Sequence, residues 1–336
     1  MAGPEEARRR PALPWTVRAQ LAALSLAHRR DGSVRRLLFS LGDHRSAANP
    51  SRPDASGVRS ADVVVDAATG VWARVFSPSP PPPSAEDAPP LSVVVYFHGG
   101  GFALFSPASR PYDAFCRRLC RALGAAVVSV AYRLAPAHRF PAPYDDGLAV
   151  LRFLATSAAQ IPVPLDLSRC FLAGDSAGGN IAHHVAHRWS SSSSSASSLN
   201  LAGVVLIQPF FGGEERTEAE LELDKAIPSL SMAITDAYWR DFLPEGATRD
   251  HAAAACGVGE LAEAFPPAMV AVGGFDLLKG WQARYVEKLR GMGKPVKVME
   301  YPDAIHGFHV FPEIADSGKF LEDLKVFVQE HRAAKL

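Results

Sequence analysis

The sequence predicts an α/β fold in which helices cover both faces of one mostly parallel β-sheet. Short apolar runs rich in β-branched residues alternate with longer, partly amphipathic segments over most of the chain. This alternation is typical of parallel sheets built from strand–helix–strand units. The 336 residues, of which 48% are hydrophobic and 21% charged, also have the ordinary composition of a globular protein with a large core.

Charge and composition exclude several classes of partner. Lys+Arg and Asp+Glu both number 35, so neither nucleic acid nor an anionic membrane is an expected partner. No apolar run is long enough for a membrane span, and the N-terminus lacks the apolar core of a signal peptide. The 4 cysteines are too few for a disulfide scaffold. We expect a soluble cytoplasmic protein, with the nucleus as the alternative location, that is a monomer or a homodimer.

Two segments interrupt the alternation. Residues 14–41 are helical and partly amphipathic, with a break at Asp31 and Gly32. They either close over a pocket as a lid or pack as helices on the outside of the domain. We take residues 1–55 as a cap segment and residues 210–250, with a helix over 232–242, as a cap insertion.

Eight strands are expected within one domain that spans residues 1–336. The first two form a hairpin, because alternating runs flank the turn Ala68-Thr-Gly70. The later six alternate with helices, and no internal repeat is visible. The strands are expected at 62–66, 71–76, 91–97, 125–131, 170–173, 203–208, 268–273 and 296–301, and the helices between and after them at 109–123, 144–156, 180–189, 281–292 and 315–332.

The stretch Gly174-Asp-Ser-Ala-Gly178 is the motif around which the chain is organised. It lies between an apolar run and a helix-forming segment, the context in which Gly-x-Ser-x-Gly indicates a serine nucleophile. A serine on so tight a turn has a strained backbone, so the residues two positions away must be small enough not to clash. The start of the helix also favours negative charge that develops beside Ser176. Taken alone, the pattern fits an ordinary glycine-rich turn equally well.

Two further side chains follow other strands at the same edge of the predicted sheet. Asp276 comes after the strand 268–273 and His306 after the strand 296–301. Ligand sites in parallel sheets lie beyond these carboxyl ends, and the order Ser, Asp, His is that of α/β-hydrolases. His306 would take the proton of Ser176 and return it to the leaving alcohol, while Asp276 would fix the imidazole tautomer. Alone, Asp276 fits a helix cap better.

The run His98-Gly-Gly-Gly101 supplies the fourth part of a hydrolytic site. Three glycines after a buried strand allow the backbone to turn its amides toward a ligand. Gly99, Gly100, Gly101 and Ala177 are therefore the candidate oxyanion donors, and which two of the glycines take part stays open. His98 is expected to brace this loop, and an ordinary glycine turn is the alternative.

Other histidines and acids are weaker candidates. His183 and His187 have the i, i+4 spacing of zinc ligands, but His184 stands where the general-base Glu of such sites is needed. His309 is the reserve base and Asp303 the reserve acid. We expect no metal and no cofactor.

Five motifs of this chain occur together in one known group of proteins. They are His98–Phe102, Tyr132–Pro136, Pro141–Asp146, Gly174–Asn180 and Gln208–Gly213. In this combination the chain resembles the hormone-sensitive-lipase-like α/β-hydrolases, and more narrowly the plant carboxylesterases and their relatives, the gibberellin receptors. The resemblance covers roughly residues 14 to 332. It implies an α/β-hydrolase fold, hydrolysis of short or medium acyl esters, no cofactor and an N-terminal helical lid.

The chain departs from this pattern at three places. Gly280 stands where the family has a second acidic residue after the triad Asp, and Ala137 stands where it has a Glu. Both changes affect loop support more than chemistry. The resemblance further implies that the receptors replace the triad His, whereas this chain keeps His306.

The sequence therefore predicts a serine carboxylesterase that hydrolyses short- or medium-chain esters of small molecules through an acyl-enzyme. The first alternative is a non-catalytic hormone-binding protein like the gibberellin receptors. The second is a hydrolase of one specialised signalling ester or lactone, which would use the same chemistry with a different pocket.

Overall fold

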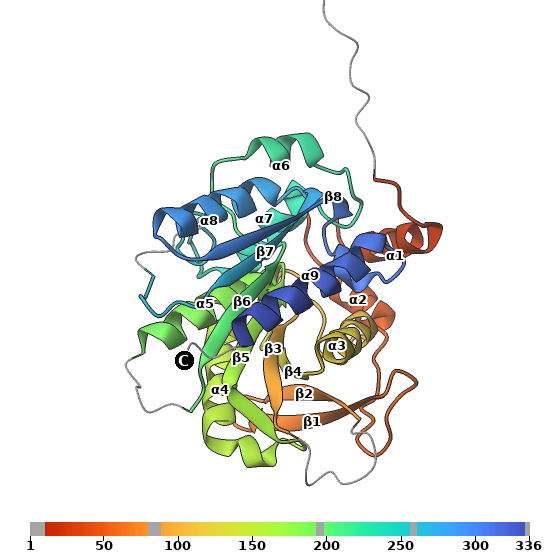
Figure 1. Ribbon diagram of the computed structural model, residues 1–336. Helices are drawn as coiled ribbons and strands as arrows, with labels where there is room; N and C mark the ends of the chain where they lie inside the picture. Colours follow the sequence, from red (N-terminus) through yellow and green to blue (C-terminus); the bar gives the residue numbers. More distant parts are fainter. Residues whose placement is uncertain (1–10, 80–88, 193–197, 256–260, 333–336) are drawn as a thin grey trace, which may run out of the picture.

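One eight-stranded sheet forms the centre of the protein (Figure 1). The computed structural model describes residues 11–79, 89–192, 198–255 and 261–332. The strand order is β1-β2-β4-β3-β5-β6-β7-β8; β2 is antiparallel to β1 and β4, and all other neighbours are parallel. The predicted mostly parallel sheet is confirmed. Its strands are β1 (Val58–Asp66), β2 (Val71–Pro78), β3 (Leu91–Phe97), β4 (Ala126–Ala131), β5 (Leu165–Asp175), β6 (Leu201–Ile207), β7 (Ala268–Phe275) and β8 (Val296–Ile305).

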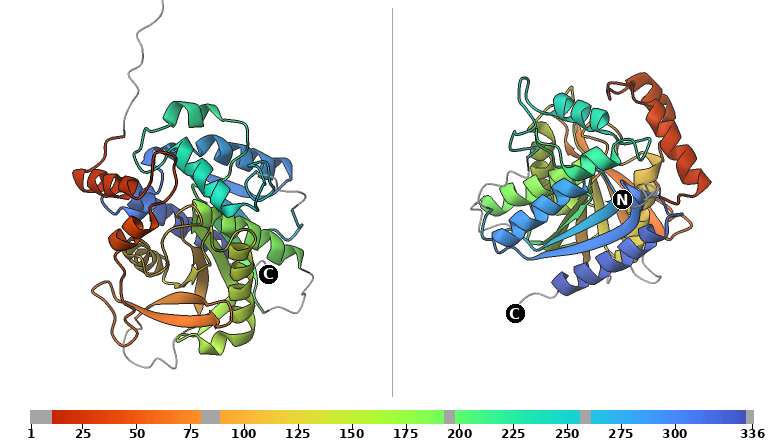
Figure 2. Two further views of the ribbon diagram at one scale, coloured as in Figure 1. Left: turned by 180° about the vertical axis from the view of Figure 1, so that it is seen from behind. Right: turned by 90° about the horizontal axis from the view of Figure 1, so that it is seen from above.

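Helices cover both faces of the sheet, as the alternation predicts (Figure 2). Leu119 and Phe327 belong to an apolar cluster on one face, and Leu151 and Ile181 belong to the cluster on the other. The sheet therefore separates two apolar layers, which is why most of its strands are continuous hydrophobic runs. The first face carries α3 (Arg110–Leu123) and α9 (Ala315–Arg332), and the second carries α4 (Ala142–Ser157), α5 (Ala177–Ser191) and α8 (Lys279–Gly291).

The order of the strands reverses at β3, which lies between β4 and β5. The chain leaves β3 through α3 toward one side and returns through α4 to the other side. Such a switch point opens a crevice beyond the carboxyl ends of the strands. Because Phe97 pairs with Gly174, the turn after β3 and the turn after β5 lie side by side at this crevice.

The N-terminal helices lie outside these layers, and the loop between them contacts α7 (Figure 2). Gly32, in the predicted break, has φ +79 and packs so closely that a Cβ there would lie 1.9 Å from the carbonyl oxygen of Ala233. The His28 ring nitrogen Nε2 shares a 2.8 Å hydrogen bond with the hydroxyl of Tyr238. The N-terminal segment is therefore joined to the later insertion. The helices of the two segments are α1 (Trp15–Leu26), α2 (Arg36–Gly42), α6 (Glu218–Leu223) and α7 (Met232–Phe242).

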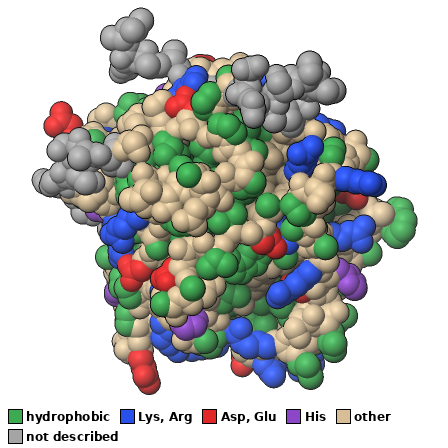
Figure 3. All heavy atoms as spheres, turned by 90° about the horizontal axis from the view of Figure 1, so that it is seen from below, with side chains coloured by type: hydrophobic (Ala, Val, Ile, Leu, Met, Phe, Trp, Pro, Cys, Tyr) green, Lys and Arg blue, Asp and Glu red, His purple; other side chains and the backbone are tan. Residues whose placement is uncertain are grey.

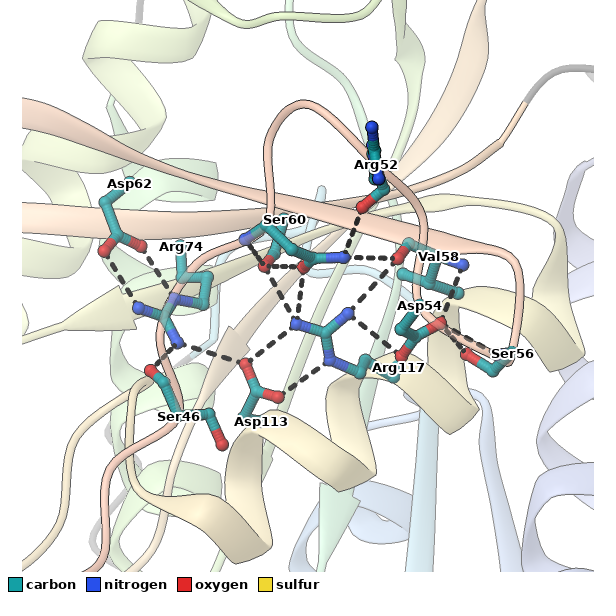
Figure 4. Close-up of polar contacts among 11 residues, drawn as sticks. Ser46, Arg52, Asp54, Ser56, Val58, Ser60, Asp62, Arg74, Asp113 and Arg117 are labelled. Carbon is teal, nitrogen blue, oxygen red and sulfur yellow. Dashed lines mark hydrogen bonds and ion pairs between the residues drawn. The ribbon is translucent and has the colours of Figure 1, made fainter.

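A buried network of charges holds the loop between α2 and β1 against α3 (Figure 4). Asp113 of α3 lies between two guanidinium groups, 2.7 Å from Arg117 Nε and 3.1 Å from Arg74 Nη1. The Arg117 side chain is 12% exposed and Asp113 is 7% exposed. The remaining acceptors around Arg117 are Asp54, Asn49, Ser60 and the carbonyl oxygen of Val58.

The surface shows no concentration of one charge on the face drawn in Figure 3, where basic, acidic and apolar side chains are interspersed. In the described ranges, no helix combines the length and the apolar character that a membrane crossing requires. Three of the cysteines, Cys116, Cys120 and Cys170, are buried free thiols, and Cys256 lies outside the described residues.

Candidate active site

Ser176 occupies the turn between β5 and α5 in a strained conformation. Its φ of 52° and ψ of −118° lie in a region that residues with a side chain rarely adopt. A Cβ on Gly174 would lie 2.2 Å from the carbonyl oxygen of Gly178, and one on Gly178 would lie 1.9 Å from that of Phe97. The prediction that both flanking residues must be small is confirmed, because neither position has room for a Cβ. Ser176 is 8% exposed at the first turn of α5.

Asp276 and His306 are joined across the ends of β7 and β8. The imidazole Nδ1 lies 2.9 Å from Asp276 Oδ2, and the carboxylate is fully buried while the His306 side chain is 14% exposed. Asp276 also accepts hydrogen bonds from the amide of Leu278 at Oδ1 and from Gln282 Nε2 at Oδ2. Each carboxylate oxygen therefore has a donor, which orients the group toward the imidazole.

The electrostatics of this pair favour a protonated imidazole. Burial lowers the pKa of His306, but the charge and hydrogen bond of Asp276 and the charge of Asp175 outweigh it, so the pKa is raised above its ordinary value. Among the described residues, no hydrogen bond joins the hydroxyl of Ser176 to the imidazole. The structure thus brings the acid and the base into contact and places the nucleophile at another strand end of the same edge.

The three glycine amides after β3 differ in whether they already have a hydrogen-bond acceptor. The amide of Gly99 donates to Asp175 Oδ1 at 2.8 Å, so it already has an acceptor. The amides of Gly100 and Gly101 have no acceptor in the described part of the chain, and that of Ala177 starts α5, where no intrahelical partner exists. These three are the amides available to an oxyanion. His98 Nδ1 contacts the carbonyl oxygen of Gly99 at 2.8 Å, in keeping with a bracing role.

Asp175, the residue before Ser176, connects the glycine turn to the nucleophile through its hydrogen bond with Gly99. Tyr96 donates its hydroxyl to Oδ1 at 2.6 Å and Tyr112 donates to Oδ2 at 3.0 Å. Burial raises the pKa of the Asp175 carboxyl to about 6, although these hydrogen bonds, the charge of His306 and the amide of Gly99 lower it. Asp175 therefore resists ionisation in the folded protein more than in the unfolded chain.

This raised pKa predicts a pH-dependent loss of stability. The contribution of Asp175 is complete below the unfolded pKa near 4 and is lost as the pH rises through about 6. In the wild type, this loss should lower the free energy of unfolding by about 3 kcal/mol between about pH 4 and neutral pH. We expect Asp175→Asn to lack this decline, because an amide does not ionise. Urea denaturation of both proteins over that pH range measures it. Parallel curves for the two proteins would contradict the assignment.

In the described residues, no hydrogen bond joins the weaker candidates to this pair. His309 is fully buried beside Tyr96 and Asp175, and burial lowers its pKa to about 3. Asp303 is exposed. His183 contacts the hydroxyl of Tyr285 at 2.9 Å. The described residues contain no group of three or more His, Cys, Asp or Glu side chains arranged to hold a metal ion.

Gln282 and Tyr238 are site neighbours that the sequence motifs did not reveal. Gln282 lies six residues after Asp276, in the first turn of α8, and no sequence pattern connects it with Asp276, because Asp276 precedes the helix. Tyr238 comes from α7, and a Cβ on Gly101 would lie 2.2 Å from its ring. No local pattern connects α7 with the glycine turn, since 137 residues separate the two positions.

Comparison with known proteins identifies the family of this chain. A family model described as an alpha/beta hydrolase fold matches residues 94–310. The gibberellin receptor GID1C of Arabidopsis thaliana is 38% identical over 319 residues, which cover 91% of this chain and 90% of the receptor. Carboxylesterase 20 of the same plant is 39% identical over 242 residues, which cover 71% of this chain and 72% of the esterase.

Solved structures agree with this assignment. An esterase of Pyrobaculum calidifontis superposes with a TM-score of 0.70 at 26% identity, over 98% of this chain and 97% of that one. The matched family region runs from β3 into the loop after His306 and so contains every candidate site residue. The chain belongs to the α/β-hydrolase family, within the group that includes the carboxylesterases and gibberellin receptors of plants.

Proposed function

We propose that this protein is a serine carboxylesterase that hydrolyses short- or medium-chain esters through an acyl-enzyme. Ser176 is the nucleophile, His306 the general base and acid, and Asp276 the residue that holds the imidazole tautomer. The observation that carries the proposal is the 2.9 Å hydrogen bond between His306 Nδ1 and Asp276 Oδ2, which leaves Nε2 to accept a proton. A hydrogen bond from the serine to the base is often long without substrate and shortens when substrate binds.

The proposed reaction has two steps, acylation of Ser176 and hydrolysis of the acyl-enzyme. The oxygen Oγ of Ser176 attacks the ester carbonyl carbon while His306 Nε2 takes its proton, and the carbonyl oxygen becomes an oxyanion. The amides of Ala177 and of Gly100 or Gly101 donate to that oxyanion. The C–O bond to the alcohol then breaks, and the alcohol leaves with the proton from His306. Water attacks the acyl-enzyme with His306 as base, which releases the carboxylic acid and restores the serine.

A covalent probe tests this proposal directly. We expect a fluorophosphonate to label the wild-type protein and to leave Ser176→Ala unlabelled, because the reagent needs an activated hydroxyl. With a chromogenic acetate ester, turnover should fall by about 10³ or more in the variant, leaving only what the oxyanion amides provide. Wild-type protein that neither reacts with the probe nor turns over an ester would overturn the proposal.

Hormone binding without turnover is the second candidate, favoured by the 38% identity to a gibberellin receptor. The retained His306 opposes it, since a binding site needs no general base. Equilibrium dialysis of a gibberellin against wild type and Ser176→Ala separates the two candidates. Tight binding by both proteins, together with no ester turnover, would favour the receptor-like role.

Hydrolysis of one specialised ester or lactone would use the same residues. A panel of esters of different acyl length distinguishes such a specialised hydrolase from a general carboxylesterase.

We further propose that residues 1–55 and 210–250 form a cap over this site within a single domain. Support comes from Tyr238, whose ring packs on Gly101 and whose hydroxyl is bonded to His28 of the N-terminal segment. Residues 1–10 lie outside the described residues. The buried free thiols suit a reducing compartment, so we propose the cytoplasm or the nucleus as the location.

A further inference from the structure

Gln208, the residue that follows β6, contacts both peptide groups that flank His306. Its side chain is buried, with the whole residue 1% exposed. Nε2 donates to the carbonyl oxygen of Ile305 at 3.1 Å, and Oε1 accepts from the amide of Gly307 at 2.8 Å. One amide group thus holds the backbone on either side of the candidate base, and only this orientation of the amide satisfies both contacts.

The surrounding backbone is shaped to keep this side chain in place. Gln208 has φ +46, a left-handed conformation that is costly for a residue with a side chain. Its own amide donates to the carbonyl oxygen of Ala271 at 2.9 Å, which fixes the residue beside β7. A Cβ on Gly273 would lie 2.4 Å from Gln208 Nε2, so the neighbouring strand leaves room for the amide.

The same turn is bonded to the backbone of the nucleophile. The amide of Ser176 donates to the carbonyl oxygen of Ile207 at 2.9 Å, and the amide of Phe210 donates to the carbonyl oxygen of Ser176 at 2.8 Å. Residues 207–210 therefore hold Ser176 through the main chain and the His306 loop through the Gln208 side chain. No other described side chain hydrogen-bonds to both flanks of His306.

We propose that Gln208 is a positioning residue that sets the location of His306 relative to Ser176. This inference rests on the proposed esterase function. Asp276 orients the imidazole ring, and the pairing of Ile305 with Phe275 holds the backbone before it, but neither contact connects His306 to the strands nearer the nucleophile. Gln208 supplies the further restraint, which connects the base to the strand that lies between the nucleophile and the acid. A displacement of about 1 Å in such a site lowers the rate by about 10².

The first test is the nearly isosteric variant Gln208→Leu, which removes both hydrogen bonds. We expect kcat for a short-chain acetate ester to fall by about 10²-fold while KM changes less than about threefold, because the acyl pocket is untouched. Lys294→Met is the matched control, since Lys294 Nζ also bonds two backbone carbonyls, those of Ala262 and Glu263, before the amino ends of β7 and β8 and so at the opposite edge of the sheet from His306. It should lower thermal stability without changing kcat. A kcat for Gln208→Leu within threefold of wild type, measured on folded protein, overturns the inference.

The second variant, Gln208→Glu, covers the case in which Gln208→Leu fails to fold. The carboxylate keeps an acceptor for the Gly307 amide, cannot donate to Ile305 and adds a negative charge beside the imidazole, whose charged neighbours are otherwise Asp276 and Asp175. We expect the acidic limb of the kcat/KM profile to move to higher pH, with kcat reduced at least tenfold. An unshifted limb with full kcat overturns the inference.

A readout that needs no turnover separates this inference from the proposed function. The pKa of His306, followed by NMR of its ring protons and assigned with His306→Asn, should fall in Gln208→Leu as the bond to Asp276 loosens, and rise in Gln208→Glu. If wild type has no esterase activity but both shifts occur, the esterase proposal fails and the positioning role stands. If the pKa is the same in all three proteins, the positioning role fails.

Discussion

Asp276→Asn is expected to lower kcat by about 10⁴-fold, because an amide in this position stabilises the wrong imidazole tautomer and no longer stabilises the imidazolium. The side chain is fully buried and its Oδ2 accepts from both His306 Nδ1 and Gln282. An asparagine with its oxygen at the Oδ2 position turns its NH₂ group toward the amide of Leu278, which is also a donor. In the opposite orientation the NH₂ group faces the donors of Gln282 and His306, so neither orientation satisfies the three donors that the carboxylate accepts from.

The same variant should change the pH dependence of the residual activity. The pKa of His306 is raised in the wild type, where burial is outweighed by the charge and hydrogen bond of Asp276. Catalysis needs the neutral imidazole, so wild-type activity rises with pH through this raised pKa. Removing the charge lowers the pKa, and the acidic limb of kcat/KM moves to lower pH.

Steady-state kinetics with a chromogenic acetate ester between about pH 5 and 9 measures both effects. The matched control is Asp303→Asn, the same chemical change at an exposed carboxylate only three residues before His306. It should leave kcat within a factor of about two. An Asp276→Asn enzyme that keeps a tenth of the activity, or a control that loses as much, would exclude Asp276 as the triad acid.

Arg117→Met is expected to give the largest loss of stability, about 3–5 kcal/mol in the free energy of unfolding. The apolar side chain fills most of the space but leaves Asp113 with only the Arg74 partner. It also removes the donor to Asp54 Oδ2 and one of the donors to the Val58 carbonyl oxygen (Figure 4). Breaking such a buried network leaves desolvated acceptors without compensation.

Urea denaturation at neutral pH measures this loss. Arg45→Met is the control, because Arg45 is 67% exposed and its nitrogen lies 3.6 Å from Asp43. Its removal should cost less than about 1 kcal/mol. The network joins α3 to the loop between α2 and β1 and contains no candidate site residue. We therefore expect the kcat of the folded Arg117→Met protein to stay near that of wild type. Equal losses in the two variants would show that burial of Arg117 contributes nothing.

The elements most accurately predicted were those with the strongest periodicity and clearest ends. The helix expected at 232–242 is α7 with the same bounds, and the break at Asp31 and Gly32 separates α1 from α2. β5 begins five residues before the predicted run, at Leu165, because polar residues interrupt the apolar pattern there while the segment still pairs with β3. The short helix α6 was not predicted, since six residues carry too little periodicity.

The chemistry of the candidate site was visible in the linear chain because it depends on residue types at strand ends. Gly-x-Ser-x-Gly specifies its own turn, and the order of Ser176, Asp276 and His306 follows from the order of the strands. These are local or topological properties. They need no knowledge of which side chains meet.

Contacts between distant segments could not be obtained in that way. The amide of Gly99 is occupied by Asp175, the ring of Tyr238 rests on Gly101, and Gln208 spans the backbone around His306. Each contact depends on distances of a few ångströms between elements whose separation along the chain carries no information about their packing. Strand pairing and side-chain packing set those distances, so these contacts form only once the sheet has formed.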